Sequence, residues 1–266
     1  MNKLISTRLM TAITIVLIFQ LFCFSSSSLA AEELSWEWDD SDSLQYFNQY
    51  QSPVESWELM KDQYGIQLYL GNIQGTDIKA FKGVTRINSS VNSLLAVMSH
   101  AEACPQWVHN CEVSFLVHDN GVRDRYVYQS YDLMFPVGKR DYLFSASLTQ
   151  DPGTGTVTIN MEATPMHCRN NPAARCKTIN QSDNIMIQKS RGFYRLEPMP
   201  DGSTLVTWEQ FTDPAGDLPI WIVNQLVLNV PFMTLKGLQD VVKEKQYQQA
   251  NNILDKDTLL TGDIGE

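Results

Sequence analysis

The chain has 266 residues, enough for one large domain or two small ones, and its 43% hydrophobic and 19% charged residues are typical of a globular protein. It carries 20 basic and 30 acidic residues, a formal net charge of −10. This acidic balance excludes nucleic acid as a partner and excludes charge-driven binding to an anionic membrane surface.

The first 30 residues have the pattern of a secretory signal peptide. Lys3 and Arg8 precede an apolar run over 9–24, and small residues follow up to Ala30. This order predicts cleavage after Ala30. The alternative is an uncleaved membrane anchor, but the run is short for a spanning helix. We therefore expect an exported protein, periplasmic if the source is Gram-negative and otherwise secreted. Cleavage would leave 18 basic and 30 acidic residues, a net charge of −12.

Four cysteines follow the predicted signal peptide, and an exported protein can hold them as disulfides. Four cysteines allow three pairings, which a sequence alone cannot decide. Cys168 and Cys176 lie in one polar stretch, and Cys104 and Cys111 flank a short segment that contains Trp107. We favour the two local pairs, Cys104 with Cys111 and Cys168 with Cys176.

The amino-terminal part of the chain predicts an arm, a helix, two strands and a second helix. Residues 31–53 are acidic and aromatic without a clear period, so we expect an arm there. The second helix, over 91–103, is indicated by apolar residues at i, i+3, i+4 and i+7, and Pro105 is expected to end it. The first helix is predicted at 54–64 and the two strands at 66–70 and 78–87.

The middle of the chain reads as strands joined by short turns, for example at Asp119-Asn120-Gly121, where Asn and Gly accept positive φ. A loop over 164–182 carries the second cysteine pair. Six strands are predicted here, at 112–118, 122–133, 140–150, 156–163, 184–196 and 203–211.

A long, kinked helix is predicted over 217–250. Asp217 is a suitable N-cap, Pro219 fits the first turn, and Pro231 should kink the helix. Its first half is apolar on nearly every face, so it must be covered on nearly every face. Eight antiparallel strands form a sheet wide enough to curl around such a helix. We therefore expect one α+β domain over 54–250, with an internal cavity and a tail at 251–266.

Three segments resemble the START domains, the lipid-transfer modules related to the steroidogenic acute regulatory protein. Cys104-Pro105-Gln106-Trp107 resembles the Pro-x-Trp that ends the family's first long helix. Residues 135–142, FPVGKRDY, resemble its Pro-x-Arg-Asp-(Phe/Tyr) segment. Residues 213–221, DPAGDLPIW, resemble its link into the carboxy-terminal helix. Each motif alone is weak, but the three together occur in the family's order.

The resemblance implies the helix-grip fold, a curved antiparallel sheet wrapped around a long carboxy-terminal helix. It implies a hydrophobic tunnel that holds one lipid-like molecule, with that helix and the adjacent loops as the gate. It implies carriage without catalysis, no cofactor, transient contact with a membrane and a monomer. Steroidogenic members place a carboxylate and an arginine in the cavity, whereas the matching positions here are Val127 and Ala146. A sterol is therefore not the expected ligand.

Candidate ligand contacts follow from the resemblance and from the alternation of side chains along a strand. Gln129 and Tyr131 could bind a polar head or belong to an internal network. Arg140 and Asp141 form either a charge pair at the cavity mouth or a structural pair that fixes the strand. The expected cavity lining is Trp107, Val127, Gln129, Tyr131, Tyr142, Phe144, Ala146, Trp221, Ile222, Gln225, Leu226 and Asn229.

Two other functional classes stay open. A polyketide cyclase or aromatase could use the same fold, with Arg140, Asp141 and Tyr131 as its acid–base set. A non-catalytic envelope protein could instead bind a protein partner. A metal site is not expected, since His100 and Cys104, at i and i+4, have no further paired ligands.

Overall fold

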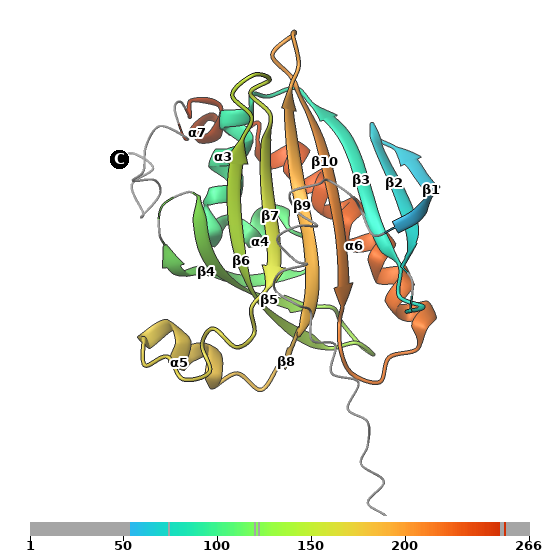
Figure 1. Ribbon diagram of the computed structural model, residues 1–266, viewed down its shortest axis with the longest axis vertical. Helices are drawn as coiled ribbons and strands as arrows, with labels where there is room; N and C mark the ends of the chain where they lie inside the picture. The colour runs from blue at the N-terminus through green and yellow to red at the C-terminus, as the bar shows by residue number, and fades with distance from the viewer. Residues whose placement is uncertain (1–53, 74, 120, 122, 251–252, 254–266) are drawn as a thin grey trace, which may run out of the picture. The chain divides into compact units, whose positions relative to one another are not determined.

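The computed structural model describes residues 54–73, 75–119, 121, 123–250 and 253 (Figure 1). The predicted signal peptide, the acidic arm and most of the carboxy-terminal tail lie outside the described residues. Among the described helices, none is long and apolar enough to span a bilayer.

The described residues form one antiparallel sheet with the strand order β1-β2-β3-β10-β9-β7-β6-β5-β4, and β8 pairs in parallel with β6. The pairing of β3 with β10 places the amino-terminal strands β1–β3 next to the last strand of the sheet. The strands are β1 (Val54–Gln63), β2 (Ile66–Ile73), β3 (Ala80–Ile87), β4 (Cys111–Asp119), β5 (Asp124–Asp132), β6 (Lys139–Gln150), β7 (Val157–Ala163), β8 (Ile185–Met186), β9 (Lys189–Pro198) and β10 (Thr204–Asp213).

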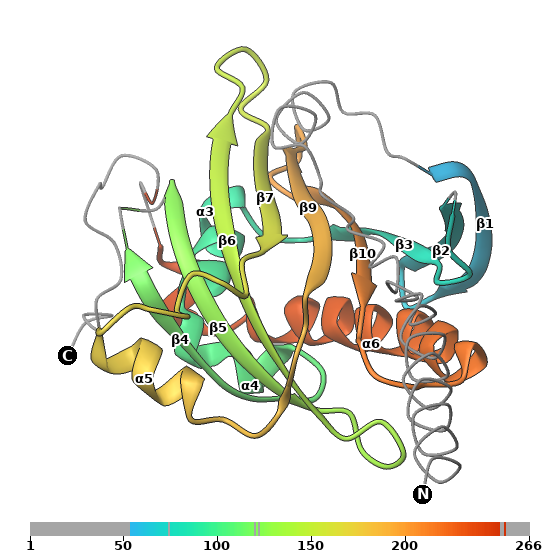
Figure 2. The same ribbon diagram turned by 60° about the horizontal axis from the view of Figure 1, so that its bottom comes forward.

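The sheet curves around α6, which lies in its concave face (Figure 2). This helix packs against β2, β3 and the short α4. The sequence therefore predicted the helix-grip architecture correctly. The helices are α3 (Val91–Ser99), η1 (Ala101–Ala103, a 3₁₀ turn), α4 (Cys104–Trp107), α5 (Ala174–Asn180), α6 (Ile220–Val241) and α7 (Lys245–Gln248).

The helix predicted at 54–64 is wrong, because this segment is the edge strand β1. Tyr64 and Gly65 both have positive φ, 55° and 71°, and form a tight turn that leads directly into β2. Gln63 then pairs with Ile66, and the ladder continues to Val54 opposite Ile73. Pairing with a neighbouring strand therefore overrides the apolar spacing that suggested a helix.

Several predicted boundaries also need correction. The helix predicted over 91–103 ends at Ser99, and Pro105 lies in the first turn of α4 instead of ending a helix. The loop at 164–182 contains α5, and the strand at 184–196 divides into β8 and β9. The final helix begins at Ile220 after Pro219, without the Asp217 side-chain cap, and α7 is a separate turn.

The main core lies between α6 and the sheet. Leu235 and Leu238 are fully buried, as are Ile66 and Leu68 of β2. Helix α4 approaches α6 so closely that a Cβ built on Gly237 would lie 2.2 Å from the Trp107 carbonyl oxygen. Only glycine fits this crossing.

A second, smaller core lies on the other face of the sheet. There α5 and the Cys168–Cys176 disulfide cover Tyr128 and Leu143. The other disulfide joins Cys104 of α4 to Cys111 of β4. Both predicted local pairs are confirmed: the first fixes α4 against β4, and the second fixes α5 to the loop that precedes it.

Candidate functional site

A cavity of about 230 Å³ lies between α6 and the concave face of the sheet. Small-molecule sites typically measure roughly 300–1,000 Å³, so this one suits a single compact ligand. Most of its lining residues are apolar, and none of those in the described part of the chain is Asp or Glu. Eight predicted residues line it: Trp107, Val127, Gln129, Tyr131, Tyr142, Phe144, Ala146 and Leu226.

The strand alternation explains the lining from β5 and β6. Gln129 pairs with Tyr142 and Val127 with Phe144, so residues at every second position of both strands face the cavity together. Tyr142 and Phe144 stack with ring centroids 4.6 Å apart. Val127 and Ala146 both lie on this wall, so no carboxylate–guanidinium pair occupies these two positions.

The predicted face of α6 is wrong except at Leu226. Val223, Leu226, Val227, Val230 and Thr234 line the cavity, at the i, i+3 and i+4 spacing of one helix face. The remaining predicted residues lie on the other side of the helix, and the cavity lining does not include them. Among these, Trp221 is 70% exposed, Gln225 and Asn229 are also exposed, and Ile222 is half-buried.

The sequence analysis missed the contribution of β9 and β10 to this wall. Tyr194 and Trp208 line the cavity and stack with ring centroids 4.7 Å apart. Trp208 Nε1 donates to Gln210 Oε1 at 2.9 Å, and Gln210 Nε2 donates to Ser190 Oγ at 2.9 Å. Apolar side chains lie two positions apart at Tyr194 and Leu196 and at Val206 and Trp208, so the strand alternation in the sequence could have located these residues too.

Three tyrosines, Tyr131, Tyr142 and Tyr194, line this region of the cavity. The Tyr131 hydroxyl donates to Gln129 Oε1, so these two predicted residues form an internal pair. Burial raises the pKa of Tyr131, Tyr142 and Tyr194, and each hydroxyl lies within electrostatic reach of another. All three are therefore neutral at physiological pH.

Arg140 is a structural clamp between two loops. It is 1% exposed, and its guanidinium donates to the carbonyl oxygens of Pro214 at 2.6 Å, Val137 at 2.7 Å, Lys139 at 3.0 Å and Ala215 at 3.1 Å. These bonds join the β5–β6 loop to the β10–α6 loop.

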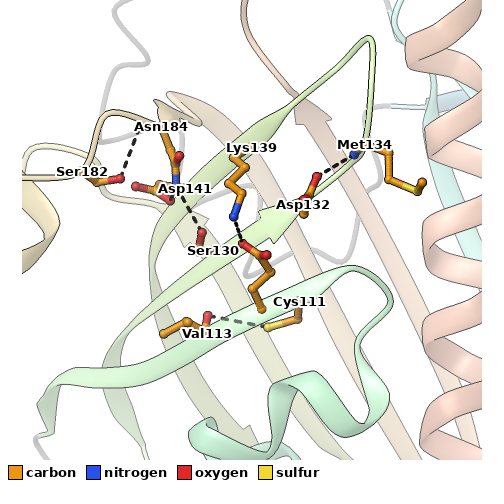
Figure 3. A network of polar contacts seen from close by, with 10 residues as sticks. Cys111, Val113, Ser130, Asp132, Met134, Lys139, Asp141, Ser182 and Asn184 are labelled. Carbon is orange, nitrogen blue, oxygen red and sulfur yellow. Dashed lines mark hydrogen bonds and ion pairs between the residues drawn. The ribbon is translucent and has the colours of Figure 1, made fainter.

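The predicted pairing of Arg140 with Asp141 is wrong, because consecutive strand residues point to opposite faces. Asp141 accepts a bond from Asn184 Nδ2 at 2.9 Å, and Asn184 also lies beside Ser130 and Ser182 (Figure 3). Burial, with Asp141 nearby, raises the pKa of Tyr128 to about 12. Asp141 therefore belongs to the layer under α5, and the acid–base set Arg140, Asp141 and Tyr131 is not assembled in the cavity.

Exposed apolar side chains lie on the two loops that Arg140 joins and at the start of α6. Phe135 is 98% exposed and Met134 70% exposed, at the turn between β5 and β6. Trp221 and Ile220 are exposed in the first turn of α6. Arg140, which lines the cavity, bonds to the loop that carries Phe135 and to the loop that leads to Trp221.

The described residues hold no cluster of three or more His, Cys, Asp or Glu that could bind a metal ion. Cys104 is in a disulfide, which removes it as a ligand beside His100. His100 instead bonds through Nδ1 to the Tyr247 hydroxyl at 2.9 Å.

Comparison with known proteins places this geometry in context. The START domain family matches residues 43–248. An uncharacterised protein of Pseudomonas aeruginosa is 30% identical over 192 residues, which cover 72% of this chain and 89% of that protein. The crystal structure of a STAR-related lipid transfer protein fragment from Xanthomonas axonopodis is 28% identical, with a TM-score of 0.62 over 71% of this chain and 99% of that one. Human StAR-related lipid transfer protein 5 shares the fold at 14% identity, with a TM-score of 0.60 over 76% of this chain and 94% of that one.

Proposed function

We propose, from the premise that this chain belongs to the START domain family, that it binds one hydrophobic small molecule in the cavity under α6 and carries it between membranes. The observation that carries the proposal is the cavity itself, enclosed by α6 and lined mainly by apolar side chains. Burial of an apolar ligand contributes about 25 cal/mol per Å² of apolar area. The solved relative from Xanthomonas axonopodis is itself described as a lipid transfer protein.

Binding fits the cavity better than catalysis does. A general acid or base works best with a pKa near the operating pH. The tyrosines in the cavity have raised pKa values, and Arg140 is held by four carbonyl oxygens. Polyketide cyclase activity and the binding of a protein partner remain alternatives.

The rim of the cavity would make the contact with a membrane. Phe135 and Trp221 can insert into the interfacial region of a bilayer without help from charge, which suits an acidic protein. Arg140 would then keep the two loops next to each other during insertion. We propose that this contact is transient, that the carrier is a monomer, and that it acts after export, in the periplasm if the source is Gram-negative.

The experiment is native mass spectrometry of the full-length product purified from its own cells, followed by solvent extraction and lipid analysis. We expect a protein monomer with one bound lipid and an amino terminus after Ala30. A protein that co-purifies without any lipid, and that takes up no fatty acid or phospholipid in vitro, would refute carriage.

Vesicle flotation tests the membrane contact separately. F135S and W221S should each weaken binding to neutral phosphatidylcholine vesicles. Y64S is a control matched to W221S, because Tyr64 is as exposed as Trp221, at 70%, but lies at the β1–β2 turn. Equal loss in all three variants would contradict the proposed docking rim.

A further inference from the structure

Two buried tyrosines of the cavity wall have hydroxyls that the protein does not pair. Tyr142 and Tyr194 are 5% and 6% exposed, and both line the cavity. The Tyr142 hydroxyl has no hydrogen-bond partner, since the neighbouring Ser190 falls short of bonding geometry. The Tyr194 hydroxyl forms no hydrogen bond within the described part of the chain. A buried hydroxyl without a partner costs roughly 1–3 kcal/mol, so the unpaired Tyr142 hydroxyl requires a reason.

A second buried donor near this wall also lacks a partner. Trp107 Nε1 is buried without a partner, and Trp107 packs against the same small cluster as Tyr131. Indole and guanidinium groups can only donate. Arg140 and Arg125 line the cavity as well, and no carboxylate among the described residues does. Both arginines are bonded to carbonyl oxygens, so the unpaired donors beside the cavity include the Tyr142 hydroxyl and the Trp107 indole.

We infer that the ligand carries a hydrogen-bond-accepting oxygen, as in a carboxyl, ester or ketone group, and that Tyr142, Tyr194 and Trp107 bind it. This inference rests on the proposed function and adds the chemical class of the ligand's head. The apolar tail would lie against Val127, Phe144 and Ala146 of the same wall.

The chemistry of the three donors agrees with this assignment. Burial raises the pKa of Tyr142 and of Tyr194, so both hydroxyls keep their protons and can donate at neutral pH. A carbonyl oxygen has two lone pairs, so a ketone can accept from two of these donors, and the two oxygens of a carboxyl or ester group can accept from all three. A primary ammonium head cannot accept from the Trp107 indole, and it would lie among two guanidinium groups with no carboxylate among the described lining residues. A hydrocarbon would leave all three donors unpaired.

The test is displacement of the fluorescent probe N-phenyl-1-naphthylamine from the full mature protein by four ligands of matched tail length. These are dodecanoic acid, methyl dodecanoate, dodecylamine and tridecane. We expect the acid and the ester to bind at least about tenfold more tightly than the amine and the hydrocarbon, the effect of two or three hydrogen bonds. Y142F and Y194F should each weaken acid and ester binding about three- to tenfold without weakening that of tridecane.

Y128F is the matched control, because Tyr128 is equally buried in β5 but belongs to the cluster on the opposite face, near Asp141. It should lower the melting temperature and leave the ligand preference intact, whereas Y142F and Y194F should not lower the melting temperature. Equal affinities for the four ligands in the wild type, or an unchanged preference in Y142F and Y194F, would overturn the inference while carriage stands. If the probe and all four ligands fail to bind, the proposed function itself is refuted, and the inference with it.

Discussion

Replacement of Arg140 by methionine should destabilise the protein strongly, because methionine retains much of the side-chain volume but none of the donors. Arg140 makes four bonds to carbonyl oxygens, and bonds from a charged donor contribute about 1.5–3 kcal/mol each. Desolvation of the buried guanidinium offsets several kcal/mol of that gain. The carbonyls of Lys139 and Ala215 belong to partly exposed residues and can turn to water. The carbonyls of the buried Val137 and Pro214 cannot, so we expect a loss of about 3–5 kcal/mol for R140M.

Urea denaturation followed by tryptophan fluorescence would measure this loss as a lower midpoint at an unchanged slope. R86M is the matched control, because Arg86 forms a half-exposed ion pair with Asp201 and such pairs contribute little. Limited proteolysis of R140M should also cleave first within the two loops at 133–138 and 214–219. If R140M is no less stable than R86M and both loops resist cleavage, Arg140 is not the clamp.

Three further predictions concern the α4–α6 crossing, the histidine stack and the disulfides. G237A should destabilise the protein by about 1–3 kcal/mol despite a helix-propensity gain of about 1 kcal/mol, because its Cβ meets the backbone of Trp107. The control is G83A, whose Cβ meets only the end of the Leu235 side chain. Equal urea denaturation midpoints for the two variants would contradict this prediction. Burial, with His118 nearby, lowers the pKa of His167, whose ring stacks on that of Tyr126 with centroids 3.9 Å apart. As the pH drops below about 6.5, the unfolded state therefore binds the proton before the folded state does, and stability should fall. H167Q should flatten this part of a profile of melting temperature against pH. The disulfides close loops of seven and eight residues, so C104A/C111A and C168A/C176A should each lower the free energy of unfolding in urea by about 2–3 kcal/mol. Only C104A/C111A should weaken binding of the fluorescent probe, because Cys104 lines the cavity.

Much of the fold could be predicted from local patterns. Strand alternation placed Tyr142, Phe144 and Ala146 on one face, because the period of two leaves no freedom once one residue is assigned. The short spacing of the cysteines favoured local disulfides. Residues 54–64 failed because the turn at Tyr64 and Gly65, which pairs this segment with β2, is a weaker sequence signal than the apolar spacing around Trp57.

The α6 contacts could not be predicted for a different reason. Between Leu218 and Met233 nearly every position is apolar, so the sequence pattern does not show which face of the helix points inward. The presence of Gln225 and Asn229 suggested ligand contacts, yet both are exposed. Only packing against β2, β3 and α4 fixes the rotation of the helix, and these contacts join residues more than 100 positions apart.

The segment Arg140-Asp141-Tyr142 shows why its sequence is easier to recognise than its role. In a strand, Arg140 and Tyr142 share the cavity face while Asp141 points to the layer under α5. Arg140 joins two loops, Asp141 accepts a bond from Asn184, and Tyr142 lines the cavity with its hydroxyl unpaired. Three successive residues thus serve the rim, the outer layer and the cavity, so a change at each should alter a different property. Because the two charges are adjacent in sequence, they suggest an ion pair, but the alternation of the strand keeps them on opposite faces of the sheet.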